Sequence, residues 1–187
     1  MTDFPTIQLK KGHARRARTG HPWIYSNEIE MDQAATSLTP GGIVRVGTEG
    51  KPLGLASFNP HSLIAARMLS RATDTAINAG FVKDRLARAL ALRDRLFATP
   101  YYRLLHAEAD GLPGFVVDRF GDALSIQVNT AGAEILLPML LEAVDDIVSP
   151  RVIVIRADAP VRALEGLNPR VEVLRGSADR PIEVQEG

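Results

Sequence analysis

The sequence contains no cysteine, and this absence excludes several kinds of protein. Without cysteine there is no disulfide scaffold, no thiolate zinc site, no iron–sulfur cluster and no cysteine nucleophile. The four histidines, His13, His21, His61 and His106, are too scattered in the sequence to form a metal cluster. We therefore expect no metal centre in this chain.

A long apolar run is also missing. The longest one, Ile135 to Leu141, has seven residues and contains Pro138, whereas a membrane-spanning helix needs about 20 residues. The opening residues MTDFPTIQLKK contain no apolar segment of signal-peptide length. We therefore expect no membrane partner and a cytoplasmic location.

Motifs for common catalytic chemistry are absent. No GxGxxG loop follows an expected strand, and GxxxxGK[ST], GxSxG and HExxH do not occur. The segment His106 to Gly114 places Glu108 and Asp110 two residues apart, which could support acid–base chemistry. We favour a structural role in which the two carboxylates bond backbone amides of a glycine-rich turn, because no nucleophile or cofactor loop accompanies them.

What is present is the composition of a folded globular protein. The 187 residues are 45% hydrophobic and 24% charged, and this length suits one large domain or two small ones. The net charge of zero hides an asymmetry. Residues 1–72 hold nine Lys/Arg against five Asp/Glu, a difference of +4, and residues 73–187 hold thirteen against seventeen, a difference of −4. Such an asymmetry indicates that the first half meets an anion.

The positive charge of the first half is concentrated in one segment. No acidic residue follows this cluster until Glu28, and its members are Lys10, Lys11, His13, Arg15, Arg16 and Arg18. Lysine and arginine side chains, backbone amides and helix N-termini all bind phosphate oxygens, and Gly12 lets the backbone approach a ligand closely. The alternative is a solvated surface helix. We favour contact with nucleic acid.

Two aromatic residues follow the basic cluster. Trp23 or Tyr25 could stack on an unpaired base, a contact worth about 1–3 kcal/mol. For Trp23 we favour a buried role, because tryptophan can bury a large area while its N–H finds a partner. For Tyr25 both interpretations stay open. His21 and His61 are interpreted as structural residues.

The pattern of apolar residues predicts an α+β fold with two domains. The first, residues 1–72, is expected to be a small β-barrel with one short basic helix, because short apolar strands alternate with Gly/Pro turns. The second, residues 73–187, is expected to begin with a helix over Phe81–Phe97 and to continue as strand, strand, helix, strand, strand. We expect its second helix over about Glu134–Ile147, a β-like segment over Val152–Ile155 and a further short segment around Val161–Leu164.

Two segments carry a resemblance to a known family. LKKGHARRARTGHPWIYSNEI, Leu9 to Ile29, resembles the opening of the PUA domain that begins the bacterial large-subunit rRNA 5-methylcytosine methyltransferases. YRLLHAEADGLPGFVVDRFGD, Tyr102 to Asp122, resembles the start of the middle domain of that family. The resemblance implies ribosomal RNA as partner and S-adenosylmethionine as cofactor of the full-length protein. Residues expected to face RNA are Lys10, Lys11, Gly12, His13, Arg15, Arg16, Arg18 and Tyr25.

The same family has a C-terminal Rossmann-like domain that binds S-adenosylmethionine and carries a catalytic cysteine. We expect this domain to be absent from the chain, so no cofactor or catalytic residue is assigned. Ile182 to Gly187 resemble the strand that leads toward that domain, where the family has a Val-x-Glu-x-Gly pattern. These expectations describe an inactive fragment whose second domain docks on a missing catalytic domain.

The expected function is therefore that of an RNA-binding and substrate-positioning N-terminal fragment of an S-adenosylmethionine-dependent rRNA (cytosine-5) methyltransferase. One alternative is a protein-interaction adaptor or homodimerising module without catalytic activity, because an unpaired C-terminal edge strand invites pairing. The least favoured alternative is a self-contained enzyme that uses Glu108 and Asp110.

Overall fold

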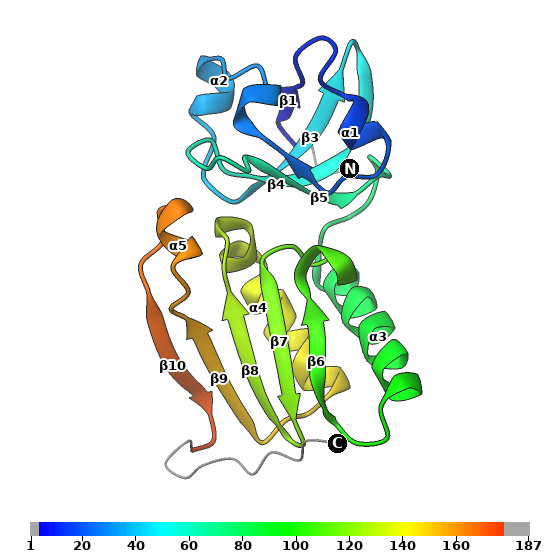
Figure 1. Cartoon of the computed structure of the whole chain (residues 1–187), viewed down its shortest axis with the longest axis vertical. Coiled ribbons are helices and arrows are strands. Elements are labelled where there is room, and N and C mark those ends of the chain that lie inside the picture. The colour runs from blue at the N-terminus through cyan, green and yellow to red at the C-terminus, as the bar shows by residue number, and fades with distance from the viewer. Residues whose placement is uncertain (1–3, 178–187) are drawn as a thin grey trace.

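Two five-stranded sheets organise the chain, one in each half, and the two halves pack end to end (Figure 1). The computed structural model describes residues 4–177. The resemblance noted for Ile182 to Gly187 therefore lies outside the described residues. Within residues 4–177, no helix is long and apolar enough to cross a membrane.

The first sheet has the strand order β1-β3-β4-β5-β2. The strands are β1 (Thr6–Gln8), β2 (Trp23–Ile24), β3 (Gly42–Thr48), β4 (Lys51–Phe58) and β5 (Ala66–Ser70). β1 runs parallel to β3, and the other neighbours are antiparallel. Just beyond the two outer strands, Leu9 forms a bridge with Ile29, so the edges of the sheet are linked.

The helices of the first half are single turns: α1 (Arg15–Arg18), η1 (Ser26–Glu28) and α2 (Gln33–Thr36). α1 is shorter than the run KKGHARRARTGH suggested. Gly12 and Gly20 flank it with φ of 83° and 109°, in the left-handed region that interrupts a right-handed helix. Ala17 anchors the turn in the core, and Arg71 Nη2 donates to the carbonyl of Ala17 at 2.9 Å.

The second sheet has the order β10-β9-β8-β7-β6. The strands are β6 (Tyr101–His106), β7 (Phe115–Phe120), β8 (Ala123–Val128), β9 (Val152–Ala157) and β10 (Arg170–Arg175). Helices α3 (Ala79–Leu96) and α4 (Ala131–Ile147) pack against one face of it (Figure 1). Each helix begins at a side-chain cap, where Asn78 or Thr130 accepts a hydrogen bond from the backbone three residues on.

The order of elements in the second half differs from the expected strand-strand-helix-strand-strand. Three antiparallel strands precede α4, and β9 then pairs with β8 in parallel, which makes a mixed sheet. The crossover through α4 permits this parallel pairing, since parallel neighbours need a long connection. The short segment expected around Val161–Leu164 is the helix α5, which begins after Pro160 with φ −57°.

Candidate nucleic-acid interface

The basic residues predicted to bind RNA lie on the loop between β1 and α1 and on α1 itself. Gly12 is exposed, and no atom would obstruct a side chain there. The exposed cationic or titratable members are Lys10, Lys11, His13, Arg15 and Arg18. Within residues 4–177, Lys10, Lys11 and Arg15 take part in none of the ion pairs. Their charges are therefore available to phosphate groups.

Arg16 and Tyr25 differ from the exposed members of the predicted set. The Arg16 guanidinium lies over the Tyr25 ring, 4.9 Å from its centroid, and its Nη2 is 2.9 Å from Nε2 of His21. The Tyr25 backbone N–H donates to the Glu28 carboxylate at 2.8 Å. Both side chains are half-buried. These contacts hold the segment in shape, and the role of Arg16 and Tyr25 toward RNA stays a prediction.

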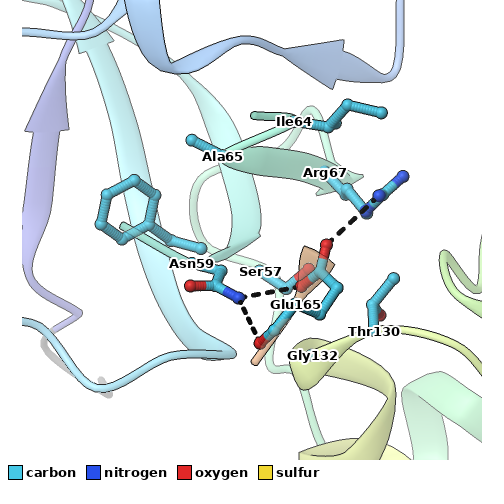
Figure 2. A pocket seen from close by; sticks show the side chains of 9 residues that line it. Ser57, Asn59, Ile64, Ala65, Arg67, Thr130, Gly132 and Glu165 are labelled. Atoms are coloured by element: carbon cyan, nitrogen blue, oxygen red, sulfur yellow. Dashed lines mark hydrogen bonds and ion pairs between the residues drawn. The ribbon is translucent and has the colours of Figure 1, made fainter. Parts of the chain in front are cut away.

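A buried carboxylate joins the two halves (Figure 2). Glu165, which ends α5, is 5% exposed and points toward Asn59 and Arg67 from the first half. Its carboxylate accepts hydrogen bonds from Asn59 Nδ2 at 3.0 Å, from Ser62 Oγ at 3.0 Å and from the Ala131 backbone at 3.3 Å. An acidic group buried with this many donors fixes the position of α5 on the first half.

Arg67 extends this contact to a second carboxylate. Its Nη2 lies 3.4 Å from Glu165, and its Nη1 donates to Glu108 Oε1 at 2.9 Å. Glu108 Oε1 also accepts the indole N–H of Trp23 at 2.7 Å. We define Arg67, Glu108, Glu165 and Trp23 as the junction cluster. Sequence reasoning missed Arg67, although a lone arginine in the apolar run around β5 was a signal.

The carboxylates of Glu108 and Asp110 both form hydrogen bonds with other residues of the chain. Asp110 forms two 2.7 Å hydrogen bonds with Arg93 and accepts the His106 backbone N–H at 2.7 Å. The expectation of backbone-amide bonding thus holds for Asp110. Glu108 instead bonds side chains of the first half, and Trp23, expected in the core of a barrel, lies half-buried at the junction.

Arg162 holds the segment that carries Glu165. This guanidinium is 2% exposed and donates to Glu134 Oε1 at 2.8 Å, to the Asn168 carbonyl at 2.7 Å and to the Val128 carbonyl. Burial raises the pKa of Glu134, but hydrogen bonds from Arg170 and Arg162 outweigh burial and lower it overall. The stability contributed by this lowered pKa is present above the ordinary pKa of 4.5 and is lost as the pH falls through the lowered value.

Comparison with known proteins places the first half. Residues 7–71 match the family described as a PUA-like domain. The chain is 38% identical over 176 residues to the "Ribosomal RNA large subunit methyltransferase I" of Vibrio cholerae. This alignment covers 92% of the chain and 44% of that protein. The protein of the same name from Aliivibrio fischeri is 37% identical over 175 residues, covering 91% and 44% respectively. The chain thus spans less than half the length of these relatives.

Part of one solved structure has the same fold. That structure is "A putative sam-dependent methyltransferase from Streptococcus mutans", with a TM-score of 0.75 at 13% identity, and the match covers 94% of this chain and 44% of that one. The expectation of a chain without a methyltransferase fold is therefore wrong. The mixed sheet with its helices, described above, belongs to a fold that also occurs within this putative methyltransferase.

Proposed function

We propose that this chain binds ribosomal RNA and positions it for an S-adenosylmethionine-dependent methyltransferase. The observation that carries the proposal is the group of exposed cations around Gly12, three of which take part in none of the ion pairs within residues 4–177. These cations contact RNA phosphates, and the junction cluster holds the PUA-like domain in a fixed orientation to the second half. The relatives named as large-subunit rRNA methyltransferases support RNA as the substrate class.

The resemblance to the 5-methylcytosine family extends the proposal to the whole protein. The product of the whole protein would be a cytosine methylated at C5 in large-subunit rRNA, with S-adenosylmethionine as methyl donor. Because the proposed substrate is ribosomal RNA, the proposed location of the protein is the cytoplasm. In this proposal the contribution of residues 4–177 is RNA binding and orientation.

Removing three exposed cations is expected to lower the affinity for RNA and to make that affinity less dependent on salt concentration. The variant is Lys10→Gln/Lys11→Gln/Arg15→Gln, which spares Arg16 because its contacts hold Tyr25. Each phosphate contact on a single strand contributes about −0.7 to the slope of log K against log salt, so the slope should become shallower by about 2. Fluorescence anisotropy of a labelled single-stranded rRNA fragment, titrated at several salt concentrations, measures it.

The matched control removes the same charge from the exposed face of α3, as Lys83→Gln/Arg88→Gln/Arg95→Gln. This variant should keep the slope of the unaltered chain. Equal slopes for the two triple variants would show that binding follows net charge rather than the surface around Gly12, and the proposed interface would be abandoned.

A second candidate function is self-association through β10. This strand is at the edge of the second sheet, and Val171 and Val173 on it are 60% and 45% exposed. An edge strand with exposed apolar side chains is a template for pairing with a second copy. Light scattering across a concentration series should show a dimer in this case, and Val173→Lys should return it to a monomer. A monomer at every concentration excludes this candidate.

A further inference from the structure

A hollow lies beside the exposed cations, between α1 and the turn that joins β3 to β4. Its volume is about 410 Å³, which exceeds the space that one phosphate group needs. Arg15 and Arg18 line it from α1, and Thr48 and Glu49 line it from the turn. Two guanidinium groups thus share one concave surface with a single carboxylate.

The conformation of the turn does not explain why residue 49 is a glutamate. Thr48 pairs with Lys51, so Glu49 and Gly50 form a two-residue hairpin loop, with φ of 48° and 74°. Positive φ at both positions favours Asn-Gly or Asp-Gly, and a glutamate there carries a conformational cost. Residues held in unfavoured backbone conformations cluster at functional sites.

The Glu49 carboxylate contacts one of the two arginines. Its Oε2 lies 3.6 Å from Nη2 of Arg18, and the two side chains are 52% and 49% exposed. An ion pair this exposed contributes little to stability, so it can open without harming the fold. While it is closed, the carboxylate occupies the guanidinium that an incoming phosphate would use.

Thr48 also lines this hollow, but its hydroxyl oxygen is closed to solvent. It is 1% exposed, and its hydroxyl has no hydrogen-bond partner within the part of the chain that the structure describes. Buried hydroxyl groups are normally satisfied by the protein, by water or by a ligand.

We propose that the hollow binds one RNA phosphate between Arg15 and Arg18, and that Glu49 holds Arg18 while RNA is absent. The proposal rests on the proposed function, since it names a phosphate subsite within that RNA-binding surface. Phosphate must displace the Glu49 carboxylate to reach Arg18. Glu49 therefore lowers the affinity for RNA, although it lies beside the cations that bind it.

Two substitutions at residue 49 separate charge from turn conformation. Both Glu49→Asn and Glu49→Asp suit a positive φ, but only Glu49→Asn removes the charge. Anisotropy titration of the full 187-residue chain with a single-stranded rRNA fragment at about 50 mM salt is the measurement. Glu49→Asn should bind about two- to fivefold more tightly, and Glu49→Asp, which keeps the negative charge on a shorter side chain, should gain less. The gain should shrink as salt is raised, because exposed charges are screened.

Arg18→Gln tests the partner of Glu49. It should weaken binding, and it should remove the gain of Glu49→Asn when the two are combined, because both changes act on one ion pair. If RNA binding by the unaltered chain weakens as salt is raised but Glu49→Asn gains nothing, the phosphate subsite is overturned and the proposed function stands. If the unaltered chain shows no salt-sensitive RNA binding, the proposed function itself fails.

Discussion

Replacing Arg67 with methionine is expected to destabilise the chain by about 3–5 kcal/mol, the usual cost of removing one partner from a buried ion pair. Arg67 is 8% exposed and contacts both Glu165 and Glu108. Without it, two carboxylates remain at the junction with no cation between them. Methionine fills a similar volume, so the loss measures charge pairing more than packing.

Urea unfolding followed by tryptophan fluorescence suits this measurement. Trp23 is the one tryptophan of the sequence, and its indole N–H bonds Glu108 within the junction cluster. Its emission therefore reports on the junction, while far-ultraviolet circular dichroism reports on the whole chain. In Arg67→Met the fluorescence midpoint should fall to lower urea, and Glu165→Gln in the same chain should restore part of the loss.

The matched control is Arg151→Met, which removes an arginine from an ion pair at the surface. Arg151 and its partner Asp122 are 80% and 52% exposed, so their separation should change stability little. A midpoint for Arg67→Met equal to that of Arg151→Met would contradict a junction held by charge.

Substituting Gly41 with alanine is also expected to destabilise the chain strongly. Gly41 has φ 86°, and a Cβ there would lie 2.4 Å from the Ala131 carbonyl oxygen at the start of α4. The left-handed conformation costs about 1–2 kcal/mol for a residue with a Cβ, and forced overpacking costs about 1–3 kcal/mol more. The two halves would have to move apart to relieve the collision.

Gly12→Ala separates these two costs. Gly12 has nearly the same φ, 83°, but an added Cβ there would have no other atom within 4 Å. This variant should therefore show only the conformational cost in urea unfolding. Trp23 emission before unfolding should change in Gly41→Ala and stay the same in Gly12→Ala. Equal losses of stability in the two variants would mean that close packing at Gly41 contributes nothing.

Local patterns were sufficient to predict the helices of the second half. Apolar residues three and four positions apart, such as Val82, Leu86 and Ala89, indicated α3, and they are buried as expected. The structure begins α3 and α4 two and three residues earlier than predicted, at Ala79 and Ala131, because Asn78 and Thr130 cap them. Cap residues are short-range signals that the apolar pattern alone does not include.

The junction could not be predicted because its partners are remote in sequence. Arg67 and Glu165 are 98 residues apart, and no periodicity relates two such positions. The prediction also missed the parallel pairing of β8 with β9, since apolar strands of this length look alike whichever direction their neighbours run. The basic segment was found because its residues are consecutive, but only the structure distinguishes exposed Arg15 from half-buried Arg16.

The sequence separation at the junction also sets an order of events during synthesis. Ribosomes add about 5–20 residues per second, so Glu165 follows Arg67 after a delay of roughly 5–20 s. Until then Arg67 and Asn59 lack their contacts with Glu165, although Glu108, the other partner of Arg67, has already been added. The contacts between the two halves are therefore complete only when α5 and Glu165 arrive, near the end of translation of this segment.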